Sequence, residues 1–91
     1  MSRTIYKYTL EIVDNQSIEV PTGAEFLTVQ IQHGKLCVWA IVDPSRRTEF
    51  EHFFIVGTGH PIPSLETLQH LGTVQLAGGS LVWHVFRAIK S

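Results

Sequence analysis

Apolar and polar residues alternate along much of this chain with the period of two that is typical of β-strands. The clearest case is Glu25–Gln32, where every second residue from Leu27 is apolar and the residues between are Thr or Gln. His33 and Gly34 follow and favour a two-residue hairpin turn, since glycine adopts positive φ at little cost. We predict a mainly β fold, either an antiparallel β-sandwich or a small barrel of about seven strands. Six other stretches have strand composition between turn residues: 5–13, 17–20, 35–42, 48–56, 73–76 and 81–89.

One stretch departs from the strand pattern. Leu65, Leu68 and Leu71 are spaced so that they would share one face of a helix. Ser64 is a suitable N-cap and Gly72 a suitable residue to end the helix. We therefore add one short helix to the predicted fold.

Two predicted strands are apolar on both faces rather than on one. Lys35–Val42 is apolar from its second residue to its last, and 81–86 within the predicted strand 81–89 is nearly so, with His84 as the exception. An antiparallel sheet normally exposes one face to water, so both strands need cover on two sides. A second copy of the chain is the simplest cover, and we expect a homo-oligomer. A closed small barrel with a bent central strand is the alternative.

The length, composition and charge of the chain argue against several classes of protein. The chain has 91 residues, of which 44% are hydrophobic and 16% are charged, and a net charge of −1. This length supports one domain, and the apolar content argues against disorder. The near-neutral charge does not favour binding to a nucleic-acid polymer. No apolar run reaches the roughly 18 residues of a membrane span, and the first residues lack the apolar core of a signal peptide.

The residues that carry chemistry form no recognisable catalytic or metal-binding pattern. Cys37 is the single cysteine, lies between apolar residues, and is expected to be buried and inert in a reducing cytosol. Glu49, His52 and His60 could supply an acid–base pair, although solvated strand residues explain them better. We assign no catalytic residue, no metal and no cofactor, and consider an enzyme less favoured than a binding protein. The five histidines lack the spacings of zinc ligands: His33, His52, His60, His70 and His84.

The most informative segment is 57–63, which reads Gly-Thr-Gly-His-Pro-Ile-Pro. Gly57 and Gly59, on either side of Thr58, allow successive backbone N–H groups to converge on an anion. His60 adds a side-chain donor, and the two prolines stiffen the loop before any ligand arrives. The alternative is a sharp structural corner in which the glycines take positive φ.

Two other features could complete a ligand site. Arg46 and Arg47 are adjacent in a predicted loop and could grip phosphate oxygens in the bidentate manner, unless the loop is simply solvated. Trp39 and Trp83 could stack a base if exposed, although they are more ordinary as core residues of central strands. A phosphorylated, nucleotide-like ligand would use all of these groups together.

Five sequence blocks stand in order along the chain: Thr-Ile-Tyr-Lys-Tyr at 4–8, Val-Pro-x-Gly-Ala at 20–24, Val-Trp-Ala-x-Val-Asp-Pro at 38–44, the segment 57–63, and Gly-Gly-Ser-Leu-Val-Trp-His-Val-Phe at 78–86. Together they resemble a family of small domains, about 90 residues long, found in tailed phages and prophage-like bacterial loci and generally uncharacterised. The Gly-Thr-Gly-His-Pro-Ile-Pro block and the last block are the most specific. The resemblance covers nearly the whole chain and implies a small accessory protein in the host bacterial cytoplasm, with no catalytic or binding residue to carry over.

Taken with the residues, this resemblance predicts a phage accessory protein that acts by binding. It would sequester a small phosphorylated, nucleotide-like signal or block a host defence protein. The alternatives are an interaction protein of the virion or its assembly and, less favoured, a small hydrolase. Nucleotide-dependent stabilisation, concentration-dependent assembly and turnover distinguish the three.

Overall fold

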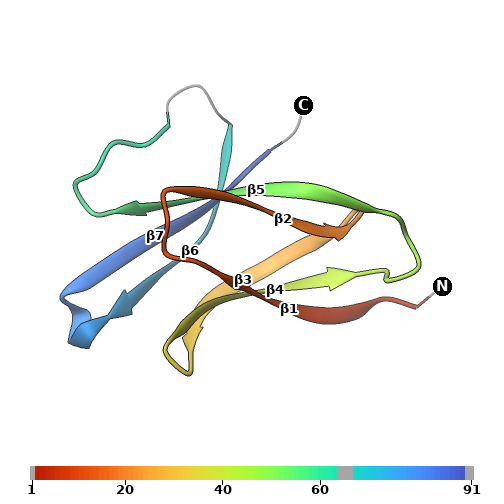
Figure 1. The fold of residues 1–91 in the computed structure, drawn as a ribbon, viewed down its shortest axis with the longest axis horizontal. Coiled ribbons are helices and arrows are strands. Elements are labelled where there is room, and N and C mark those ends of the chain that lie inside the picture. The colour runs from red at the N-terminus through yellow and green to blue at the C-terminus, as the bar shows by residue number, and fades with distance from the viewer. Residues whose placement is uncertain (1, 64–66, 90–91) are drawn as a thin grey trace.

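The computed structural model describes residues 2–63 and 67–89. Within this part of the chain there are seven β-strands and one 3-10 helix, which follow one another as in Figure 1. The elements are β1 (Thr4–Leu10), β2 (Asn15–Pro21), β3 (Glu25–Gln32), β4 (Lys35–Val42), β5 (Thr48–Gly57), β6 (Leu68–Leu76), η1 (Ala77–Gly79) and β7 (Leu81–Ala88).

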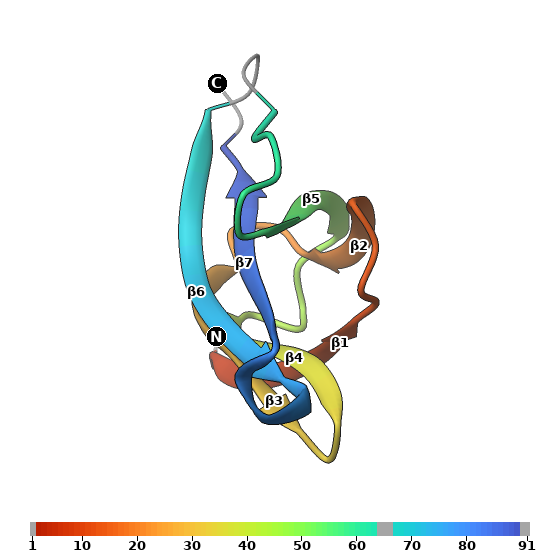
Figure 2. The same cartoon turned by 90° about the vertical axis from the view of Figure 1, so that its left-hand side faces the viewer.

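The strands form two antiparallel sheets. One has the order β1-β4-β3 and the other the order β2-β5-β7-β6. Strands β3 and β6 pack against each other where the two sheets meet, as Figure 2 shows. The predicted mainly β, sandwich-like fold is confirmed, and the described strands do not close into a barrel.

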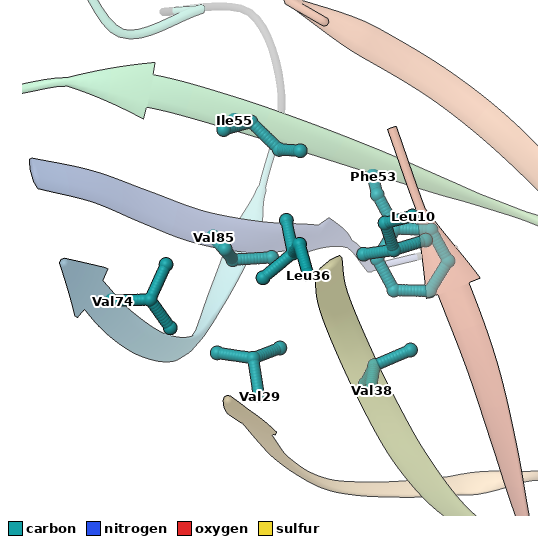
Figure 3. Packing of buried hydrophobic residues seen from close by; sticks show 8 residues of the cluster. All are labelled: Leu10, Val29, Leu36, Val38, Phe53, Ile55, Val74 and Val85. Atoms are coloured by element: carbon teal, nitrogen blue, oxygen red, sulfur yellow. The ribbon is translucent and has the colours of Figure 1, made fainter. Parts of the chain in front are cut away.

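The core lies between the sheets and takes side chains from both (Figure 3). Alternate residues of a regular strand point inward, which is the physical meaning of the period of two in the sequence. Bulges at Leu27 in β3 and Leu71 in β6 interrupt this alternation. Each buried Val, Leu, Ile or Phe stabilises the fold by about 1.5–3 kcal/mol relative to exposure. The cluster consists of Leu10, Val29, Leu36, Val38, Phe53, Ile55, Val74 and Val85.

A charged pair is enclosed beside this apolar core. Glu51 is only 6% exposed, and Arg87 Nη1 donates a hydrogen bond to its Oε1 at 3.0 Å. Arg87 Nε and Nη2 both donate to Gln69 Oε1, at 3.0 and 2.8 Å, and the guanidinium lies 5.5 Å from the centre of the Phe26 ring. The partners offset the cost of burying the two charges.

The predicted short helix is wrong where the structure describes it. Leu68 and Leu71 lie in strand β6, while Ser64 and Leu65 fall outside the described residues. The pairing of β6 with β7 shifts between His70 and Gly72, which leaves Leu71 as a bulge residue. A bulge resets the inside–outside alternation by one residue, so leucines three apart fit a bulged strand as well as a helix.

Gly72, which was predicted to end that helix, has a different role. A Cβ at this position would lie 2.7 Å from Val29 Cγ2, closer than real Cβ contacts. Val29 is a core residue of β3 and is 4% exposed. The glycine therefore allows β6 to approach β3 closely where the two sheets meet.

Candidate functional site

The loop 57–63 begins at the end of β5 with a tight turn. The His60 N–H donates to the Gly57 carbonyl oxygen at 3.0 Å, and Gly59 has a φ of 88°. This is the pattern of a type II turn, in which the third position needs positive φ. The His60 N–H is therefore hydrogen-bonded within the turn. It is not available as one of the successive N–H donors that the sequence predicted would bind an anion.

The turn also brings the His60 ring back over Gly57. A Cβ on Gly57 would lie 3.0 Å from His60 Nδ1 and 3.3 Å from the Trp83 ring. Any larger residue at Gly57 would push the imidazole away from this position. Packing therefore requires glycine at position 57. Of the two glycines in the turn, only Gly59 takes the positive φ that the structural-corner alternative expected.

A chain of hydrogen bonds runs from the turn across the outer face of the four-stranded sheet. Thr58 Oγ1 lies 2.7 Å from His84 Nε2, and His84 Nδ1 lies 2.9 Å from Thr73 Oγ1. Thr73 Oγ1 in turn lies 3.1 Å from His70 Nε2. We call these four residues the Thr–His relay.

The relay works in either direction. A neutral imidazole has one donor and one acceptor nitrogen, and a hydroxyl both donates and accepts. If Thr58 donates to His84, then His84 donates to Thr73 and Thr73 donates to His70. If the order is reversed, the Thr58 hydroxyl hydrogen becomes available to another molecule. The exposed end of the relay can therefore act as either donor or acceptor.

The relay was not predicted from the sequence, because His70 and His84 were considered as possible zinc ligands and Thr73 was not among the candidate residues. The register of the sheet brings the four residues together: His84 is directly opposite Thr73, and Phe86 is opposite His70. His84, a polar residue inside the apolar run 81–86, was the signal available in the sequence.

A hollow of about 290 Å³ lies between the turn and the outer face of β7. His60 and Ile62 also line a neighbouring hollow of about 460 Å³ that reaches Asp14 and Phe54. No Lys, Arg, Asp or Glu is among the described residues that line the smaller hollow. Its lining consists of Val56, Gly57, Thr58, Gly59, His60, Ile62, His84 and Phe86.

Trp83 borders the turn but does not offer an open stacking face. It lies opposite Gly57 in β7, and its side chain packs against the core. Its edge lines a third hollow, of about 250 Å³, together with Thr58 and His60. The Nε1 atom of Trp83 is buried and has no hydrogen-bond partner within the described part of the chain.

Arg46 and Arg47 do not join this site. They precede β5, whereas the 57–63 loop follows it, and Figure 1 shows the two loops at opposite ends of that strand. The ten residues of β5 rise about 3.3 Å each, which separates the loops by roughly 30 Å. Within one chain the predicted grip on a single phosphate by His60 and the arginines is therefore not formed.

The arginine loop is held by its own contacts. Asp43 accepts hydrogen bonds from Ser45 Oγ at 2.7 Å and from the Ser45 N–H at 3.0 Å, and these lower the pKa of Asp43. Arg46 Nε lies 4.0 Å from the same carboxylate. Arg46 is more than half exposed, which fits the solvated-loop alternative.

Trp39 lies on the other sheet, away from the loop. Its β4 position pairs with Lys7 and Thr28, on the face that points away from the core. The eight predicted site residues thus divide into three groups: the turn with Trp83, the arginine loop, and Trp39.

The remaining histidines, His52 and His33, lie outside this site. His52 Nδ1 lies 2.8 Å from Ser17 Oγ in the neighbouring strand β2. His33 lies in the β3–β4 turn, where its φ is 52°. Among residues 2–63 and 67–89, no group of three or more His, Cys, Asp or Glu side chains is placed to hold a metal ion. The described residues include no helix long and apolar enough to cross a membrane.

The sequence profile of a family described as "Domain of unknown function (DUF7352)" matches residues 1–91, and the chain belongs to this family. Neither a curated protein nor a solved structure matches the chain.

Proposed function

We propose that this member of the DUF7352 family acts by binding another molecule. Its contact surface is the 57–63 loop together with the adjoining outer face of β5, β7 and β6. The observation that carries the proposal is the hollow of about 290 Å³ between the turn and β7, which combines Thr58 and His84 of the relay with apolar walls. A few polar groups set in an apolar concavity are typical of ligand sites.

The resemblance to phage and prophage domains supports a proposal about where the protein acts and in what role. The protein works in the cytoplasm of the host bacterium during infection or lysogeny, as a counter-defence protein. It sequesters a small nucleotide-like signal, or it covers a host defence protein through the same loop. The near-neutral net charge supports a small molecule or a protein as the partner rather than a nucleic-acid polymer.

Thermal-shift measurements with linear and cyclic nucleotides test the proposal. Binding predicts a rise in Tm with ligand concentration, recovery of the nucleotide intact, and loss of the effect in Thr58→Val and His60→Ala. The double variant Arg46→Ala/Arg47→Ala is the matched control, because it lies at the other end of β5 and should keep the effect.

Two results would contradict the proposal. If the loop variants fold normally and keep every measurable binding and anti-defence phenotype, the loop is only a corner. If the nucleotide is consumed and Thr58→Val abolishes its consumption, the hydrolase alternative is correct, with the Thr58–His84 pair as nucleophile and base.

Exposed apolar residues on the outer face of the β1-β4-β3 sheet favour a second candidate, an assembly protein that associates with copies of itself. Ile5 is 57% exposed and Leu27 46% exposed, and with Trp39 they line a hollow of about 550 Å³. Large apolar residues grouped on a surface are typical of interfaces. Light scattering should then show a homo-oligomer that Leu27→Glu dissociates. Val13→Glu, also on an exposed apolar residue, should leave it intact.

A further inference from the structure

The hollow beside the Thr–His relay has an uncharged lining, and this bears on which part of a ligand it binds. Phosphate groups are normally held by Arg, Lys or clustered N–H donors. The arginines lie at the other end of β5, and the His60 N–H is used within the turn. The described residues around this hollow therefore hold no fixed positive charge for a phosphate.

We propose that this hollow binds the uncharged heterocyclic ring of a nucleoside or related compound, and that any phosphate stays outside it. The inference rests on the proposed function, since it assigns the ligand class of the same site. The sequence predicted a site that binds the phosphate group, whereas this proposal assigns a site that binds the heterocyclic ring.

The walls of the hollow suit a flat ring. Val56, Ile62 and Phe86 supply apolar surface, and Ile62 is 53% exposed before any ligand covers it. The Phe86 ring is already held from one side by His70, whose ring centroid lies 5.2 Å away at a tilt of 52°. A positioned aromatic side chain offers stacking with little loss of side-chain freedom. A volume of about 290 Å³ is at the lower end for ligand sites, which fits one ring rather than a whole nucleotide.

The relay suits the edge of such a ring. Nucleobases and similar amide-bearing rings carry donors and acceptors side by side. Thr58 can present either a lone pair or a hydroxyl hydrogen, because His84 and Thr73 exchange their donor and acceptor roles behind it. One site could therefore accept rings with different edge patterns, at the cost of weak discrimination between them.

Binding of adenosine and uridine, of their 5′-monophosphates, and of ribose 5-phosphate tests the inference directly. Isothermal titration should give each nucleoside and its monophosphate affinities within about threefold, with no loss of affinity as salt is raised, because no charge pairs form. Ribose 5-phosphate should not bind. Thr58→Val should weaken nucleoside binding about five- to tenfold, the value of a hydrogen bond or two.

Matched control variants distinguish a loss of nucleoside binding from a general effect on folding. Thr58→Ser keeps the hydroxyl and should retain affinity. Thr9→Val makes the same change as Thr58→Val at an exposed position of the other sheet, and should have no effect. His84→Asn breaks the relay and should weaken binding, whereas His33→Asn, at a turn position that asparagine tolerates, should not.

The inference and the proposed function fail in different ways. If monophosphates and ribose 5-phosphate bind, nucleosides do not, and affinity falls with salt, the ring inference is overturned while a loop-dependent binding function stands. If no nucleoside binds but a protein partner is captured through Thr58 and His60, the ring inference is likewise overturned. If Thr58→Val and His84→Asn bind as the wild type does, both the inference and the proposed surface are wrong.

Discussion

Replacing Gly72 with alanine tests how the two sheets fit together. The added Cβ would lie 2.7 Å from Val29 Cγ2 and 3.8 Å from the Val29 backbone nitrogen and oxygen. Val29 is 4% exposed and belongs to the core cluster, so its side chain has little room to move away. We expect Gly72→Ala to force β6 and β3 apart or to drive Val29 from its preferred rotamer.

The size of the effect follows from two opposing contributions. Overpacking a well-packed core costs about 1–3 kcal/mol. Replacing a glycine within a strand restricts the unfolded chain and returns about 0.5–1 kcal/mol. With the middle of each range, the free energy of unfolding should fall by about 1 kcal/mol, which lowers Tm by roughly 4–8 °C in a domain of this size.

Urea and thermal denaturation followed by circular dichroism measure this change, and a double-mutant cycle with Val29→Ala identifies its cause. If the clash is with Val29, the double variant should be more stable than the sum of the single changes by about 0.5–3 kcal/mol. Gln75→Ala in the same strand is the control and should be nearly neutral. A Gly72→Ala protein as stable as the wild type would refute the steric argument. A destabilised one with no coupling to Val29 would point to a backbone requirement instead.

Three further predictions concern charge and burial. Arg87→Met should lower the free energy of unfolding in urea denaturation by about 1.5–3 kcal/mol, because it removes the charged hydrogen bond from Arg87 to the buried Glu51 carboxylate. Glu51→Gln/Arg87→Met should recover part of that loss. Because hydrogen bonds from Ser45 lower the pKa of Asp43 below 3.8, its charged form stabilises the fold above that pH, and the effect is lost as pH falls through the lower folded-state pKa. Asp43→Ala should therefore lower Tm at neutral pH and approach the wild type in acid; a constant difference across pH would contradict this. Cys37, 2% exposed, should react with a thiol reagent only after denaturation, and fast reaction of the native protein would show that β4 opens.

Much of the fold could be predicted from local pattern. The strands β3 and β4 begin and end where the sequence predicted. From Thr28 onward, alternation and the hairpin turn fix the faces and the register. The prediction is wrong for Leu27, because a bulge between Phe26 and Thr28 leaves it exposed instead of on the buried face of Val29. His33 and Gly34 both take positive φ, as such a turn requires. The sequence also showed that β4 is apolar on both faces. The structure packs one face against the core and leaves Trp39 and Ile41 on the other face half-buried.

The β6 segment shows where local pattern fails. Its leucine spacing fits a helix and a bulged strand alike, and the sequence contains nothing that selects between them. The choice is made by pairing with β7 and by the close approach of Gly72 to Val29, two contacts with residues distant in sequence. Tertiary contacts of this kind override local propensity.

For the candidate site too, some features could be predicted from the sequence and others depend on the tertiary structure. The sequence by itself determined that 57–63 is a constrained turn, because glycine and proline restrict the backbone wherever they occur. Only the tertiary structure decided what lies beside it. The register of β7 with β5 and β6 brings His84 to Thr58 and Thr73, while the length of β5 carries Arg46 and Arg47 to the far end of the sheet. Strand order and register are long-range properties, and so the partners of a side chain are fixed only when the sheets assemble.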